Sequence, residues 1–312
     1  MSLQENIDKL SDSVKKGNQQ CKYWMVRTNA GAYFDLFVKN DYVALSRNDI
    51  PYKLLYDAKQ QYRDKANIVI KKVKEAIKES STINKSGYDE RSLSLAVSQV
   101  YKFVYEVQKN DIVIIPSENS DEICIGVFTE DHLADSRQTN ENFVYIRKVR
   151  WVKQLEKRYF DPFFYKLFTS HHAICDVSPY QEYIERCIRS QFIINDESHY
   201  VIALTSEKIK ARYLFKFGDL MLELFEDYIK SETLAFDINS IDISINLNSP
   251  GRIDFKANVK IGALLMLFIP TILTGCTTAD GHQENAEIYN SISNFRNSHS
   301  ERINGSTDII RG

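Results

Sequence analysis

An uncharged apolar run in the last third of the chain constrains the fold most strongly. Residues 261–275 read IGALLMLFIPTILTG and carry no charged side chain. Burying about ten large apolar side chains is worth on the order of 15–30 kcal/mol before entropy is counted, so this run must leave water. As a helix it would be only about 22 Å long, against a hydrocarbon core of about 30 Å. The length therefore favours burial within protein over a membrane span.

The composition is that of a globular protein without a basic surplus. The 312 residues are 43% hydrophobic and 26% charged, and the formal net charge is -2 at pH 7. Any nucleic-acid site must therefore be a local patch. The five cysteines show no metal-binding spacing, and the N-terminus lacks the pattern of a secretory signal. We expect a cytoplasmic protein with reduced thiols, no metal site and no cofactor.

Residue patterns predict an α+β protein of two domains with an arm and a tail. The expected parts are an N-terminal helix or arm at 1–19, a recognition domain at 20–178, an α+β second domain at 179–276 and a disordered polar tail at 277–312. In the first domain, runs rich in β-branched and aromatic residues predict strands at 22–27, 33–38, 42–46, 111–115, 123–128 and 143–151. Helical spacing predicts an insertion of two helices between them, at 52–79 and 90–107.

In the second domain, the pattern predicts helices at 179–190 and 207–232 and the apolar segment 261–275. Strands are predicted at 199–204 and within 236–247 and 252–259. This arrangement indicates a smaller, mixed α/β domain.

Three blocks of the first domain resemble a known module. They are CKYWMVRTNAG at 21–31, a hairpin at 109–128 that runs from KNDIVIIP to ICIGVF, and FVYIRKVRW at 143–151. Together they resemble the N-terminal module of Mrr-type restriction proteins, which is similar to PUA and EVE barrels. The resemblance implies a small PUA/EVE-like β-barrel that reads a modified or flipped base in bacterial antiviral defence. One departure is the pair Ser46-Arg47, where the family usually has Gly-Trp.

The resemblance also implies a base-binding pocket between aromatic side chains at one end of the barrel. Stacking on such side chains is worth roughly 1–3 kcal/mol per base, and hydrogen bonds to the base edge supply discrimination. Strand parity puts Arg147 and Trp151 on one face and Arg150 on the other. The candidate ligand-binding residues are Trp24, Arg27, Tyr33, Phe34, Arg147, Arg150 and Trp151. The alternative is that the tryptophans are core residues and the arginines form a solvated face.

A nuclease is an alternative from another functional class. Asp242, followed by Asp254 and Lys256, matches the outline of two acidic metal ligands and a lysine on adjacent strands. The pattern Asp-x-Lys arises often by chance, so the sequence favours a protein that is not an enzyme.

The function that the sequence favours is therefore non-catalytic recognition of DNA, RNA or a nucleotide in a restriction-like defence system. The alternative is a defence effector in which residues 261–275 insert into a membrane or drive the formation of a homo-oligomer. The two hypotheses differ at the apolar segment. In the first, the protein's own fold covers residues 261–275, and in the alternative a membrane or a second copy of the chain covers them.

Overall fold

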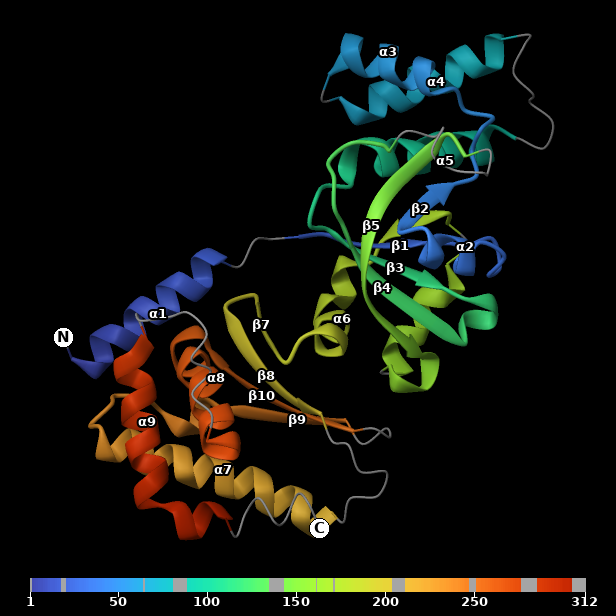
Figure 1. The fold of residues 1–312 in the computed structure, drawn as a ribbon. Helices are drawn as coiled ribbons and strands as arrows, with labels where there is room; N and C mark the ends of the chain where they lie inside the picture. Colours follow the sequence, from blue (N-terminus) through green and yellow to red (C-terminus); the bar gives the residue numbers. More distant parts are fainter. Residues whose placement is uncertain are drawn as a thin grey trace. The chain divides into compact units, whose positions relative to one another are not determined.

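The chain folds into two compact units that interleave in sequence. The computed structural model describes residues 2–17, 21–63, 65–80, 89–134, 143–160, 162–170, 172–203, 211–246, 251–275 and 285–304. One unit, here the inserted unit, is Cys21–Ile184, and the other, the terminal unit, combines Met1–Gln20 with Glu185–Gly312. The helix predicted at 1–19 thus belongs to the same unit as the second half of the chain. Both units combine helices with a sheet, so the protein is α+β (Figure 1).

A curled six-stranded sheet forms the centre of the inserted unit, with the strand order β2-β5-β4-β3-β1-β6. Its strands are β1 (Tyr23–Val26), β2 (Tyr42–Leu45), β3 (Ile112–Pro116), β4 (Glu122–Phe128), β5 (Tyr145–Glu156) and β6 (Ile174–Asp176). Strands β1 and β3 are parallel, and the other paired neighbours are antiparallel. Every residue of β1 is buried, because this strand lies between two others and is covered on both faces.

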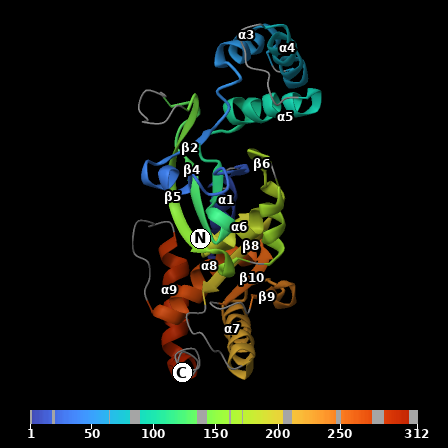
Figure 2. The ribbon, with the colours of Figure 1, turned by 90° about the vertical axis from the view of Figure 1, so that its right-hand side faces the viewer.

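The helical insertion follows β2 and consists of α3 (Tyr52–Tyr62), α4 (Ala66–Glu79) and α5 (Glu90–Tyr101). The three helices lie side by side (Figure 1, Figure 2). Helix α5 begins with a capping box between Asp89 and Ser92 and continues into a π-helical turn, η1 (Lys102–Glu106). Arg147 of β5 donates to the carbonyl oxygens of Phe103 and Val104 at 2.7 and 2.9 Å, so a buried guanidinium stabilises this turn.

One predicted strand of this unit is a helix. Residues 33–38 were expected to be extended, but the structure has α2 (Phe34–Lys39) there. Phe34 and Phe37 are both buried, and a spacing of three brings two side chains to one face of a helix, whereas a strand would put them on opposite faces. The remaining short helical turns are η2 (Glu118–Ser120), η4 (Lys157–Tyr159), η5 (Pro162–Thr169), η6 (Ser178–Tyr180) and, in the terminal unit, η7 (Ile238–Ser240).

The terminal unit contains a four-stranded antiparallel sheet in the order β7-β8-β10-β9. The strands are β7 (Gln191–Ile194), β8 (Glu197–Ala203), β9 (Asp242–Asn246) and β10 (Arg252–Asn258), and its two longest helices are α7 (Ala211–Ser231) and α8 (Val259–Thr274). The short helix α6 (Gln181–Ile188) runs across the boundary between the units. In β10, Ile253, Phe255 and Ala257 join the core formed with α7 and α8. Asp254 and Lys256 alternate with them and lie on the other face.

The apolar segment forms helix α8, which is buried in protein. Asn258 caps its start by accepting from the backbone N–H groups of Lys260 and Ile261, and Gly275 ends it with a left-handed φ of 68°. Side chains around the whole circumference are buried, as expected of a helix that is apolar all round, and they contribute to the core of the terminal unit. Among the described residues, no helix has both the length and the apolar character that a membrane crossing requires.

The predicted disordered tail is wrong for the part that the structure describes. Helix α9 (Ala286–Ser298) packs against α8, as does α1 (Leu3–Gly17). Its residues Ile288, Ile292 and Phe295 are buried in the same core as Ile7 of α1. Their spacing of four and three residues is helical, but polar residues between them hid the pattern in the sequence. Residues 277–284 and 305–312 lie outside the described part of the chain.

Candidate functional site

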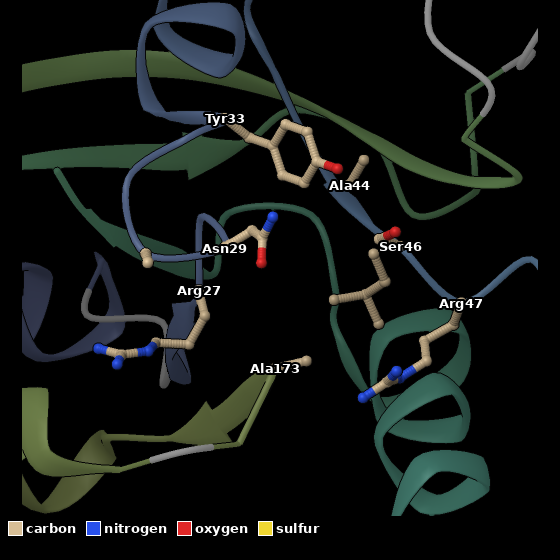
Figure 3. A pocket seen from close by; sticks show the side chains of 9 residues that line it. Arg27, Asn29, Tyr33, Ala44, Ser46, Arg47 and Ala173 are labelled. Carbon is tan, nitrogen blue, oxygen red and sulfur yellow. The ribbon is translucent and has the colours of Figure 1, made fainter. Parts of the chain in front are cut away.

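The inserted unit contains a pocket at the end of β1, with a volume of about 380 Å³. This volume falls within the range of roughly 300–1,000 Å³ that is usual for small-molecule sites. The pocket is bounded by residues that follow β1, by the last two residues of β2 and the two that follow them, and by the residue that precedes β6 (Figure 3). Its lining consists of Arg27, Asn29, Ala30, Tyr33, Ala44, Leu45, Ser46, Arg47 and Ala173.

A tightly constrained loop after β1 supplies one wall. Asn29, Ala30 and Gly31 have left-handed φ angles of 53°, 56° and 96°. A Cβ atom at Gly31 would lie 2.3 Å from the backbone nitrogen of Glu118, so only glycine fits at this position. The backbone N–H of Tyr33 donates to the carbonyl of Thr28 at 3.0 Å and closes the loop. The wall is thus held in shape before any ligand arrives.

Tyr33 forms the aromatic side of the pocket. Its ring packs edge-on against Phe143 at a centroid distance of 5.1 Å and stacks on Phe37 at 5.8 Å. Figure 3 shows the ring extending toward Ala44. The phenol is therefore fixed from behind by two other rings, and it offers both an apolar surface and a hydroxyl group.

The two arginines lie on opposite sides of the pocket (Figure 3). Arg27 is anchored, because its Nη1 donates to the carbonyl oxygen of Phe168 at 3.2 Å. In Arg47, the Nε atom is buried and has no hydrogen-bond partner among the residues that the structure describes. Arg47 is one of the residues that line the pocket. Buried donors are nearly always paired in folded proteins, so its unpaired Nε is the donor of this side chain that an acceptor would satisfy.

Of the predicted ligand-binding residues, Arg27 and Tyr33 line this pocket, and the other five do not. Trp24 has no exposed surface and donates from Nε1 to Oδ2 of Asp111 at 2.8 Å. Phe34 is also buried in the core. The sequence reasoning did not name Asn29 or Arg47 as ligand-binding residues, although the Ser46-Arg47 departure marked the second of them.

The three predicted residues of the closing strand β5 follow the expected parity. Arg147 is fully buried, and burial lowers the pKa of its guanidinium to about 10. Arg150 is exposed on the other face, and Trp151 is half-buried and donates from Nε1 to the carbonyl of Phe37 at 3.3 Å. These contacts give Arg147 and Trp151 roles in packing the inserted unit.

The predicted acidic and basic residues of the terminal unit share one face of its sheet. Lys256 lies directly opposite Asp242 in the register of β10 and β9, and Asp254 lies opposite Ser244. Asp254 is buried, whereas Asp242 is exposed. The hairpin therefore brings the three predicted residues to one face, but in different surroundings.

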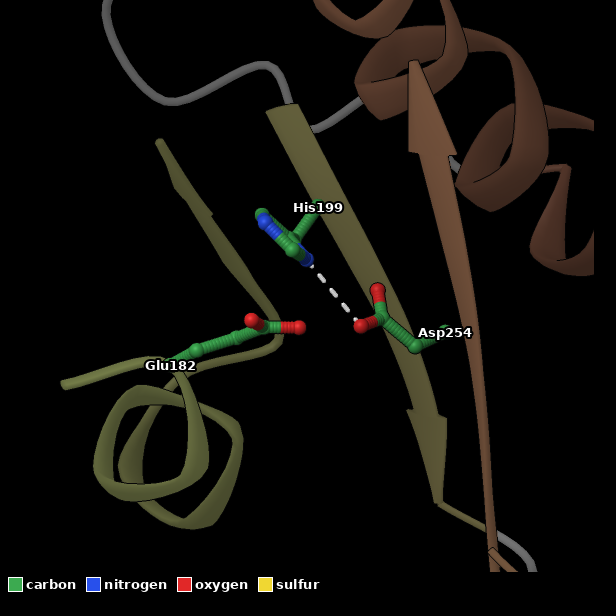
Figure 4. Close-up of side chains that lie close together, drawn as sticks. All are labelled: Glu182, His199 and Asp254. Atoms are coloured by element: carbon green, nitrogen blue, oxygen red, sulfur yellow. Dashed lines mark hydrogen bonds and ion pairs between the residues drawn. The ribbon is translucent and has the colours of Figure 1, made fainter. Parts of the chain in front are cut away.

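Asp254 takes part in a buried ionic network. Its Oδ2 atom lies 2.7 Å from Nε of Arg186. The same atom lies 3.0 Å from Nδ1 of His199 (Figure 4). The imidazole of His199 stacks on Phe192 with a centroid distance of 4.4 Å. Glu182, also drawn in Figure 4, stands on α6 one helical turn before Arg186.

Histidine and aspartate are common metal ligands, but here a guanidinium already supplies the positive charge beside the carboxylate. The geometry favours a structural ion network over a catalytic centre. Sequence reasoning missed His199 and Arg186, because only the folded strands bring them beside Asp254.

Comparison with known proteins gives a partial match to a family model. A domain of unknown function, DUF8426, matches residues 54–173. This range begins within α3 and ends just before β6, so it covers the helical insertion and strands β3, β4 and β5. Of the pocket residues, the matched range contains Ala173 alone. No curated protein and no solved structure matches the chain.

Proposed function

We propose that the protein is a non-catalytic recognition protein whose inserted unit binds one nucleotide in the pocket between Arg27 and Arg47. The nucleotide is free or part of DNA or RNA, and the biological setting is a restriction-like bacterial defence system in the cytoplasm. The observation that carries the proposal is the buried, unpaired Nε donor of Arg47 in a pocket with an aromatic wall.

The pocket lining has the chemistry that a nucleobase requires. Tyr33 offers a ring that two neighbouring rings hold in place, and stacking on such a ring tolerates any base. Asn29 and Ser46 offer hydrogen-bonding groups for a base edge. An apolar wall with a few polar groups is the usual arrangement of a small-molecule site.

The arginines suit the anionic part of a nucleotide. A guanidinium binds phosphate through two parallel hydrogen bonds, and Arg47 has an Nε donor that no described residue satisfies. Because the formal net charge is only -2, recognition has to rest on such local groups instead of on a basic surface.

The resemblance to PUA/EVE-like modules supports the same proposal. Arg27, which follows β1, is one of the residues that carry the resemblance, and it lines the pocket. The Ser46-Arg47 pair, where the chain departs from the family, follows β2 and lines the same pocket. We infer a PUA/EVE-like barrel in which Arg47 takes the position of the family's tryptophan. Exchange of an aromatic residue for a cation shifts the preference from stacking toward an anionic group.

Binding of nucleotides to the full chain tests this proposal. A thermal-shift screen with nucleosides, nucleoside monophosphates and their base-methylated forms should raise the melting temperature with at least one phosphorylated ligand. Arg47→Ala should abolish that shift. Arg150→Ala is the matched control, because Arg150 is an exposed arginine of β5 that does not line the pocket. Equal loss in both variants, or retention in Arg47→Ala, would overturn the proposal.

A further inference from the structure

The segment after β5 concentrates cations and aromatic rings on the inserted unit. Lys157 lies 5.0 Å from the ring centroid of Tyr165, Arg158 lies 5.0 Å from that of Tyr159, and Lys166 lies 4.9 Å from that of Phe163. Three such cation–ring contacts thus lie within about ten residues of sequence. We call the described residues of this segment, 157–160 and 162–168, the basic ledge.

The 3₁₀ helix η5 of the ledge has an inner and an outer side. Phe164 and Leu167 are buried. Phe163 is 45% exposed and packs near Tyr180 and Tyr183, with centroid distances of 5.5 and 5.3 Å. The ledge thus presents an aromatic side chain to solvent that other rings support. The rings of Tyr180 and Tyr183 are inclined to that of Phe163 by 38° and 34°, and Lys166 lies over its face. The exposed part of the Phe163 ring is the surface on which an unpaired base would stack.

The charge of the ledge fits a polyanion. Arg158 is paired with Glu156 at 2.9 Å, so its charge is largely neutralised. Neither Lys157 nor Lys166 has an ion-pair partner among the described residues, and both lie against ring faces. The ammonium groups of Lys157 and Lys166 can contact phosphates, and the exposed ring of Phe163 can contact a base.

The ledge begins at the pocket. Arg27, which lines the pocket, donates to the carbonyl of Phe168 at the far end of η5. A 3₁₀ helix rises about 2.0 Å per residue, so Phe163 lies about 10 Å from Phe168 along its axis. Stacked nucleotides are spaced about 3.4 Å apart along one strand, and the ledge therefore has room for about three of them.

We propose that the ligand is a single strand of nucleic acid, with one nucleotide in the pocket and about three neighbours along the basic ledge. The inference rests on the proposed function, because the pocket must first hold a nucleotide. A duplex should not bind in this way, because its bases are stacked on one another and cannot stack on Phe163.

Titrations of the full chain by fluorescence anisotropy and calorimetry test the length of the ligand. The probes are random-sequence single strands of four and eight nucleotides, as DNA and as RNA, an eight-base-pair duplex, and a mixture of the nucleoside monophosphates. The tetranucleotides should bind at least tenfold more tightly than the monophosphates, and the octanucleotides should add less than a further threefold. Comparison of the affinities for the DNA and the RNA strands shows which sugar the protein prefers.

Variants test the ledge itself. Phe163→Ala and Lys166→Ala should weaken tetranucleotide binding about 5- to 100-fold and leave monophosphate binding unchanged. Phe215→Ala is the matched control, since Phe215 is 65% exposed on α7 in the terminal unit. Circular dichroism and melting temperature establish that each variant is folded.

The outcomes separate the two proposals. Two results would overturn the proposal for the ledge and leave the proposal for the pocket standing. One is tight binding of monophosphates with no gain in affinity for longer strands. The other is an equal effect of Phe163→Ala and Phe215→Ala on tetranucleotide binding. Equal affinity for the duplex would also overturn the ledge. Absence of binding to every probe would overturn both proposals.

Discussion

Trp24 and Asp111 are joined by a buried hydrogen bond of 2.8 Å across 87 residues of sequence. The carboxylate of Asp111 also accepts from the backbone N–H groups of Lys22 and Gln108, each at 2.9 Å. Three donors therefore satisfy one buried carboxylate, and they tie the start of β1 to the start of β3. Trp24 holds the inserted unit together at the strand that leads into the pocket.

Replacement of Trp24 by phenylalanine should reduce stability and spare nucleotide binding. The variant keeps a ring in the core but leaves Asp111 without one of its donors, which should lower the free energy of unfolding by about 1–3 kcal/mol. Urea unfolding followed by circular dichroism measures this. In a double-mutant cycle with Asp111→Asn, the coupling energy should be about 0.5–3 kcal/mol. Unchanged stability with lost binding would instead assign Trp24 to the ligand.

The ion pair between Arg186 and Asp254 should matter more than a surface pair. Arg186→Met would leave a carboxylate that is 3% exposed without its cation, and we expect a loss of about 3 kcal/mol in unfolding free energy. Arg302→Met is the control, because Arg302 pairs with Glu223 and Asp227 at 40% exposure and should cost under about 1 kcal/mol. Similar losses in both variants would contradict the burial argument.

Two helical glycines of the terminal unit should respond in opposite directions to alanine. A Cβ at Gly262 of α8 would lie 2.0 Å from Cβ of Ser198, whereas one at Gly218 of α7 would first meet Ile243 at 3.5 Å. Gly218→Ala should stabilise the protein by up to about 1 kcal/mol through helix propensity. Gly262→Ala should destabilise it, because α8 must move away from β8. Melting temperatures of the two variants measure the difference, and a gain in both would refute the close approach.

The terminal unit should lose stability at alkaline pH through Tyr228. Burial raises the pKa of Tyr228 to about 12, while a tyrosine in the unfolded chain titrates near 10. Between these values the unfolded state binds fewer protons than the folded state, so stability is full below pH 10 and falls as pH rises toward 12, by up to roughly 2–3 kcal/mol. Urea unfolding by circular dichroism from pH 8 to 11 measures this. A Tyr228→Phe variant should show a shallower decline, and an identical slope would exclude Tyr228 as the cause.

Local patterns were sufficient to predict most of the sheet elements. The strands at 22–27, 42–46 and 111–115 have β-branched and aromatic residues in short runs, and these runs become β1, β2 and β3. Residues 33–38 have the same composition, yet they form α2. Composition could not distinguish the two cases, because burial of Phe34 and Phe37 by the rest of the inserted unit decides the backbone conformation.

The site was less accessible to sequence reasoning than the fold. Arg27 belongs to the motif at 21–31 and Tyr33 lies two residues after its end, and both line the pocket. Trp24 belongs to the same motif, but its environment depends on Asp111, which is distant in sequence. Arg47 differs from the pattern of the resembled family, so the resemblance does not point to it as a ligand-binding residue. A residue that replaces a family motif can keep the position while changing the ligand chemistry.

The interleaving of the two units has a consequence for synthesis on the ribosome. Helix α1 supplies Ile7 to a core whose other members include α8 and α9, and about 240 residues separate the end of α1 from the start of α8. At a synthesis rate of about 5–20 residues per second, roughly 12–50 s pass between the synthesis of α1 and that of α8. The inserted unit emerges complete within that interval. We therefore expect the inserted unit to fold while α1 is still unpaired, and the terminal unit to complete its core only after α8 and α9 have left the exit tunnel.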